Sequence, residues 1–467
     1  DGKPGTEDDV APRLPMGPRI VDCNDLFIYP AFIDPYVEVD APRPGAEAAG
    51  RHWNDFVTPQ RTALDGAGID SRTADSLRKL GFAAAAISPS GGIFRGSSAV
   101  VSLAKPVSEE SAAKPPVYGT LAYQTVAFDT SGRGYPGSLM GAIALVRQTL
   151  SDAQWQADNR AGGAITGPFD AVDFLAPEQK YKENDRGPAR ATMLLMTAGD
   201  ELDTLRCFKI ADEFNRPFMM LGSGYEFRRL AAIAERKDVL HIIPLAFPKA
   251  PDVSSPGKAE STELRELMTW EQAPTNPRRL AQAGIPFALT TAKLRDRNEF
   301  RKNLLSAIKH GLTEDQALAA LTTTPADIAG VAGTVGTIER GKRANLIVSD
   351  GPIFAEKSKI RAVWADGREH EISRGDNRIE GEWTFPMGHG DAAVEATLVI
   401  SKDAISIKLP KPPEEKAADE KAPDEKAEGA EPAADKPAEP PAGDDAARPA
   451  PEGDAAAADA QPAEEKK

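Results

Sequence analysis

Short apolar segments alternate with amphipathic ones from about residue 80 to residue 330, and this alternation constrains the fold more than any other feature. Segments with the length and composition of buried strands are 82–87, 192–196, 218–221, 239–245 and 287–290. Segments with helical spacing of apolar residues are 140–153, 201–214, 227–235, 277–283 and 299–310. Strands that follow one another through helices pair in parallel. The pattern therefore predicts an α/β fold, either a doubly wound sheet or a (β/α)8 TIM-like barrel.

One segment inside this region departs from the alternation. Residues 93–103 are predicted to form a β-hairpin with Arg95 and Gly96 at its turn, because glycine adopts the positive φ angles that tight hairpin turns require. The glycines at 91, 92 and 96 match neither a phosphate-binding loop nor a dinucleotide fingerprint. We therefore expect this stretch to serve the architecture rather than to bind a nucleotide.

The sequence changes character after Val331. The segments 336–338, 344–348, 360–364 and 380–408 have strand composition, and the first three are separated by glycine turns. This pattern predicts a barrel over residues 31–330, followed by a β module over residues 331–409.

A second change occurs at residue 410. Residues 411–467 carry 17 acidic and 8 basic side chains, and the net charge of this segment is more than half of the chain's formal charge of −15. The segment includes no aromatic residue, Leu, Ile or Val. Such a segment buries too little apolar surface to offset its ordering entropy. We predict that 410–467 is a disordered acidic tail, either a solubilising spacer or a docking segment for a basic partner.

Composition excludes several classes of protein. The chain has no basic stripe interleaved with aromatic residues, so we expect no nucleic-acid partner. No run of 18 apolar residues exists, so we expect no membrane span. Cys23 and Cys207 are expected to be core thiols rather than a disulfide framework. The chain begins with Asp1, which indicates a removed leader or a fragment, and the sequence leaves open whether the protein is cytoplasmic or exported.

Two segments resemble the amidohydrolase superfamily, in particular its imidazolonepropionase-like and dihydroorotase-like branch. The first is VDCNDLFIYPAFIDPYVE at 21–38, which is similar to the first barrel strand of that family. The second is LTTTPADIAGVAGTVGTIERGKRANLI at 321–347, continued by VWADG at 363–367. The resemblance implies a TIM-like barrel with a small composite β-sandwich domain built from both ends of the chain, to which residues 1–30 contribute partial N-terminal strands.

The resemblance also implies a metal site that this sequence does not reproduce. Family members hold one or two divalent ions with an H-x-H pair on the first strand and an aspartate after the eighth, together with groups from the fourth to sixth strands. Here the H-x-H positions are Tyr36 and Glu38, and the aspartate position is Ala292, or Thr291 if the register shifts by one. The fourth- and fifth-strand ends, at 196–198 and 221–224, contain no ligand.

His241 is the one histidine near a plausible ligand strand, the sixth. It precedes Ile242 and Ile243, so it lies at the start or middle of that strand, whereas barrel active sites lie at the C-terminal ends. A core histidine and a metal ligand both remain open. Arg95 and the pair Arg228-Arg229 are either anion-binding groups in the barrel mouth or solvated surface arginines.

The leading hypothesis is a catalytically silent amidohydrolase-like protein that binds no metal. It would act as a structural or regulatory partner of an active homologue, self-associate, or bind a small ligand. The alternative is an active hydrolase of non-peptide carbon–nitrogen bonds with an atypical site. It would use one zinc or other divalent ion held by Glu38, His241 and a further carboxylate, or no metal. The mouth candidates are therefore Tyr36, Glu38 and His241.

Overall fold

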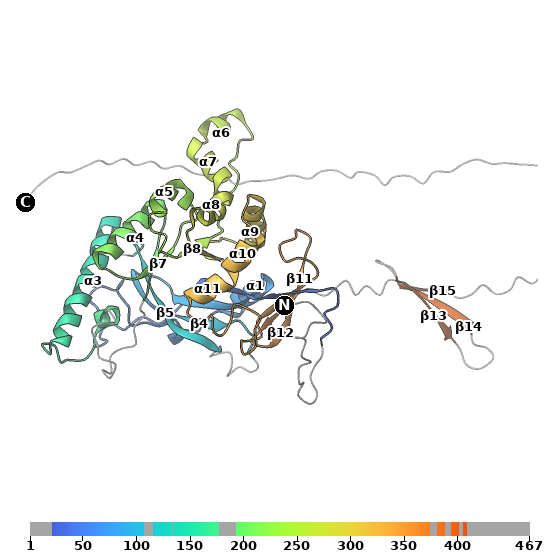
Figure 1. The fold of residues 1–467 in the computed structure, drawn as a ribbon, viewed down its shortest axis with the longest axis horizontal. Helices are drawn as coiled ribbons and strands as arrows, with labels where there is room; N and C mark the ends of the chain where they lie inside the picture. Colours follow the sequence, from blue (N-terminus) through green and yellow to red (C-terminus); the bar gives the residue numbers. More distant parts are fainter. Residues whose placement is uncertain are drawn as a thin grey trace, which may run out of the picture. The chain divides into compact units, whose positions relative to one another are not determined.

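The computed structural model describes residues 21–106, 115–132, 134–176, 193–373, 381–387, 394–400 and 405–408 (Figure 1). The chain divides into two compact units, residues 1–377 and residues 378–467. The acidic tail predicted at 410–467 and the first 20 residues lie outside the described residues.

An eight-stranded, barrel-like sheet forms the centre of the first unit, as the α/β prediction requires. Its strands are β2 (Phe32–Val39), β3 (Phe82–Pro89), β4 (Phe94–Ser102), β5 (Val117–Ala127), β6 (Leu194–Thr197), β7 (Phe218–Leu221), β8 (His241–Pro244) and β9 (Phe287–Thr290). They lie in chain order, and β5 to β9 pair in parallel as expected for crossover connections. Side chains cover both faces of β3, β7, β8 and β9, which is typical of parallel sheets.

The prediction of a hairpin within 93–103 is wrong. This segment is a single strand, β4, which runs antiparallel to both β3 and β5. The connection from β3 to β4 is too short for a helical crossover, and only antiparallel strands can be joined so directly. Arg95 and Gly96 lie at a register shift in β4, so the glycine serves a bulge rather than a turn.

Helices form an arc around these strands in Figure 1. They are α1 (Ser71–Lys79), α3 (Leu139–Ala161), α4 (Glu201–Glu213), α5 (Leu230–Ile233), α6 (Pro256–Ser261), α7 (Leu264–Gln272), α8 (Asn276–Ala283), α9 (Glu299–Lys309), α10 (Glu314–Leu321) and α11 (Thr323–Ile328). Short 3-10 helices are η1 (Ala63–Asp65), η2 (Ala171–Leu175), η4 (Glu226–Arg229) and η5 (Ala273–Thr275). Caps fix their ends: Asp200 accepts hydrogen bonds from the first turn of α4, and Gly284 ends α8 in the left-handed conformation. In the part of the chain that the structure describes, no helix is long and apolar enough to cross a membrane.

A four-stranded sheet combines both ends of the first unit. It contains β1 (Phe27–Pro30), β10 (Leu346–Ser349), β11 (Ile360–Ala365) and β12 (Arg368–Glu371), and β1 pairs antiparallel with β10. The predicted strand at 336–338 is absent, and these residues form an irregular, bent segment after α11. A separate three-stranded sheet of β13 (Gly381–Met387), β14 (Val394–Ile400) and β15 (Ile405–Lys408) lies in the second unit. The stretch predicted as one module, 331–409, therefore spans two units.

Candidate functional site

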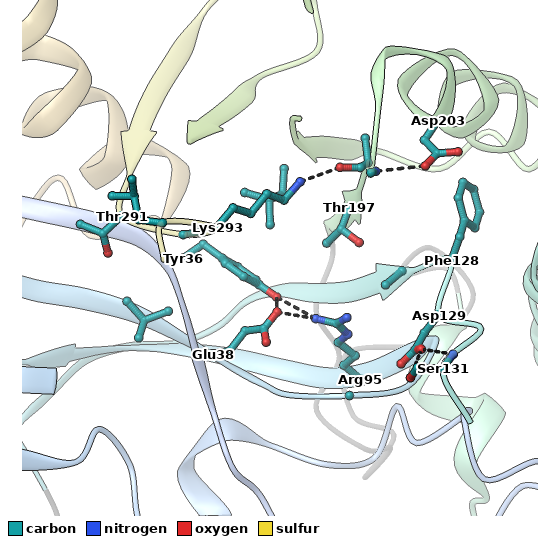
Figure 2. A pocket seen from close by; sticks show the side chains of 18 of the residues that line it. Tyr36, Glu38, Arg95, Phe128, Asp129, Ser131, Thr197, Asp203, Thr291 and Lys293 are labelled. Atoms are coloured by element: carbon teal, nitrogen blue, oxygen red, sulfur yellow. Dashed lines mark hydrogen bonds and ion pairs between the residues drawn. The ribbon is translucent and has the colours of Figure 1, made fainter. Parts of the chain in front are cut away.

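A cavity of about 790 Å³ opens at the C-terminal ends of the barrel strands (Figure 2). Its walls include the ends of β2, β6 and β7 and the segment 291–294 that follows β9. Arg95 of β4 and the segment 127–131 at the end of β5 complete the lining. Barrel enzymes place their active sites at this end of the strands, so this cavity is the candidate site. We call it the mouth cavity.

Tyr36 and Glu38 both line the mouth cavity, because residues i and i+2 of a strand point to the same face. The Tyr36 hydroxyl donates a hydrogen bond to Glu38 Oε1 at 2.8 Å. Arg95 Nη1 donates to the same oxygen at 2.7 Å and to the Tyr36 hydroxyl at 3.0 Å. Burial raises the pKa of Tyr36, so this phenol remains protonated and acts as a donor at neutral pH. The two positions predicted to face the mouth do so, and Arg95 joins them there.

These residues do not fit a divalent metal ion. A catalytic zinc site uses about three protein ligands, and no group of three His, Cys, Asp or Glu that could hold a metal is found among the described residues. Glu38 is the carboxylate at the first-strand positions, and its Oε1 already accepts two hydrogen bonds. A cation bound there would also be repelled by the guanidinium of Arg95, which lies 2.7 Å from that oxygen.

The end of β9 supplies no ligand either. Ala292 and Thr291 both line the mouth cavity, as predicted for the aspartate position of the family pattern. Thr291 Oγ1 and the Thr291 backbone N–H both donate to Asp34 Oδ2, at 2.6 and 3.1 Å. Burial raises the pKa of Asp34, whereas hydrogen bonds from Thr290 and Thr291 lower it. Asp34 of β2 and Thr291 at the end of β9 thus bond to each other where the two ends of the sheet meet.

His241 lies away from the mouth cavity. Its neighbour Ile242 packs inside the barrel with Ile33 and Met219, so His241 points outward toward the helices, where its ring lies 6.3 Å from that of Phe208. It is fully buried, and burial lowers its pKa to about 4, which keeps the imidazole neutral. Its two ring nitrogens have no hydrogen-bond partner among the residues described. His241 therefore does not belong to the site with Tyr36 and Glu38. Arg228 also lies elsewhere, paired with Glu201.

Lys293 is the residue at the mouth that the sequence analysis missed. Its ammonium donates to the carbonyl oxygens of Ala198 at 2.6 Å and Gly222 at 2.8 Å, just beyond the ends of β6 and β7. The residue as a whole is exposed, yet its ammonium is enclosed enough that desolvation lowers the pKa of Lys293. Its backbone adopts φ +62°, which is uncommon outside glycine. The available signal was a charged residue, Lys293, shortly after the end of β9.

Three comparisons place this geometry among known proteins. Residues 275–372 match the sequence pattern of the family described as "Amidohydrolase family". A stretch of 90 residues is 36% identical to the imidazolonepropionase of Shouchella clausii (strain KSM-K16), and it covers 17% of this chain and 19% of that enzyme. The solved structure of an amidohydrolase from Thermotoga maritima MSB8 aligns with 76% of this chain and 90% of its own, with a TM-score of 0.56 and 21% sequence identity. The structural likeness concerns the fold.

Proposed function

We propose that this chain, as a member of the amidohydrolase superfamily, has a barrel that is catalytically silent as a metal-dependent hydrolase and binds a small ligand at its mouth. The observation that carries the proposal is the hydrogen-bonded set of Tyr36, Glu38 and Arg95, which occupies the positions where the family pattern has its first two ligands. A structural or regulatory role beside an active homologue, or self-association, is compatible with such a barrel.

The metal-dependent form of the alternative is a hydrolase of carbon–nitrogen bonds with one metal ion. It would need Glu38 and His241 to bind the same ion, but Glu38 lines the mouth cavity whereas His241 faces the helix layer. Zinc ligands lie about 2 Å from the ion, so two side chains on opposite faces of the sheet cannot share one. The geometry therefore favours the silent barrel over a hydrolase with this metal site.

Metal content per chain tests this proposal. After dialysis against buffer with trace zinc and manganese, the purified protein is expected to hold less than about 0.1 equivalents of either metal by mass spectrometry, because the mouth lacks three ligands. The variant Glu38→Gln separates binding at the mouth from binding elsewhere. About one equivalent in the wild type that is lost in Glu38→Gln would overturn the proposal. Metal that persists in Glu38→Gln does not depend on the mouth carboxylate.

A further inference from the structure

The acidic side chains that line the mouth cavity already have partners. Glu38 Oε1 accepts from Tyr36 and Arg95. Asp129 Oδ2 accepts from the Gly92 backbone N–H at 2.9 Å, and its Oδ1 accepts from the N–H and hydroxyl of Ser131. Asp203 accepts from the Gly199 N–H at 3.0 Å and from Arg206 at 2.7 Å. The carboxylates are thus largely occupied by donors of the protein itself.

The basic side chains of the cavity, in contrast, keep unused donors. An ammonium group has three N–H bonds, and Lys293 uses two of them on the carbonyl oxygens of Ala198 and Gly222. Arg95 directs Nε to the Gly92 carbonyl and Nη1 to Tyr36 and Glu38, while its Nη2 has no partner in the described part of the chain. Both residues line the same cavity (Figure 2). The mouth therefore has free hydrogen-bond donors that carry positive charge, on Lys293 and on Arg95.

The position of Lys293 is fixed by the fold. Its left-handed backbone is less stable than an ordinary conformation for a residue with a side chain. The two carbonyl bonds compensate for this cost and hold the ammonium across the ends of β6 and β7. This arrangement places a positive charge at the mouth of the barrel with no metal ion. A preorganised cation binds an anion without reorganising first.

The rest of the cavity wall includes apolar surface. Phe128, Leu221 and Leu294 line it beside the charged groups. A pocket with apolar walls and a few fixed polar groups suits a ligand with an apolar body and one polar end. The unused N–H groups of Lys293 and Arg95 are cationic donors, and they suit a polar end that is an anion with acceptor oxygens.

We propose that Lys293 and Arg95 bind the carboxylate of a small organic acid whose apolar body contacts Phe128, Leu221 and Leu294. The inference rests on the proposed function, because it takes the mouth to be a binding site organised without a metal ion. The ammonium of Lys293 would contact the carboxylate from the side of β6 and β7, and the guanidinium of Arg95 would contact it from β4.

The experiment compares benzoate with benzamide by isothermal titration calorimetry on the full chain. The two probes share a ring and differ in charge, so the cationic pair should favour benzoate by at least about tenfold. The variant Lys293→Met should weaken benzoate binding by at least about tenfold. Lys209→Met removes the same charge from an exposed position on α4, outside the cavity, and should leave the affinity unchanged.

Three results would overturn the inference: equal affinity for benzoate and benzamide, unchanged benzoate affinity in Lys293→Met, or no benzoate binding to the wild type below about 10 mM. The comparison of probes uses the wild type, so it decides the matter even if Lys293→Met does not fold. Failure here is distinct from failure of the proposed function. A metal-free protein that binds both probes equally overturns the carboxylate site alone, whereas stoichiometric metal at the mouth overturns the silent barrel.

Discussion

Replacing Asp34 by alanine is expected to lower the free energy of unfolding by about 3 kcal/mol or more. Asp34 is fully buried in β2 and accepts four hydrogen bonds. Two come from the hydroxyls of Thr290 and Thr291, both at 2.6 Å, and two from the backbone N–H groups of Thr291 and Tyr36, both at 3.1 Å. Alanine leaves two buried N–H donors without acceptors, each of which costs about 1–3 kcal/mol.

The effect should be large because Asp34 joins the two ends of the sheet. The strand order runs from β2 to β9, and the carboxylate of Asp34 bridges these two strands through Thr290 and Thr291. Asp34→Asn is expected to be intermediate, since an amide keeps one acceptor oxygen but presents N–H groups to a second set of donors.

Urea unfolding followed by tryptophan fluorescence measures the loss. Asp327→Ala is a matched control, because Asp327 is exposed on α11 and should change stability by about 0.5 kcal/mol or less. An Asp34→Ala variant within about 1 kcal/mol of the wild type would show that packing alone closes the barrel.

Much of the parallel part of the barrel was predictable from the sequence. The strands at 218–221 and 287–290 have the predicted bounds. Each is a short apolar run between two helical segments, so the length of the run also gives the length of the buried strand. The second sheet was harder, because β1 and β10 are far apart in the chain and only the family resemblance linked them.

Site residues were predictable where the alternation of side chains along a strand determines which face they occupy. They were not predictable where the order and direction of the strands bring a residue to the mouth. The family resemblance singled out Tyr36 and Glu38, and their spacing of two on one strand predicted that both face the mouth. Arg95 reaches the mouth from an antiparallel strand, β4, that the alternation of strands and helices does not anticipate. His241 could have been set aside on the same period of two, because Ile242 next to it takes the inward position.

Glycine at position 96 shows why the hairpin prediction failed, and it leads to the second large effect. Glycine is favoured both in tight turns and in bulges, so its presence alone does not separate the two. In β4 it has φ +119°, in a region that residues with side chains rarely adopt. A Cβ at this position would lie 2.5 Å from the Arg61 carbonyl oxygen and 2.9 Å from Arg61 Cβ. The Arg61 carbonyl cannot move freely, because it accepts from the Ser97 N–H at 2.9 Å.

Gly96→Ala is therefore expected to destabilise the protein by about 2–4 kcal/mol through both the backbone conformation and the collision. Two glycines separate these causes. Gly68 has φ +70°, and a Cβ there would meet nothing within 4 Å, so Gly68→Ala should lower the free energy of unfolding by about 1 kcal/mol. Gly45 has no positive φ, and a Cβ there would meet nothing within 4 Å, so Gly45→Ala should leave the free energy of unfolding nearly unchanged. Urea unfolding should show the smallest loss of stability for Gly45→Ala, a larger loss for Gly68→Ala and the largest loss for Gly96→Ala. Equal losses for Gly68→Ala and Gly96→Ala would contradict a collision with Arg61 as a cause of the destabilisation.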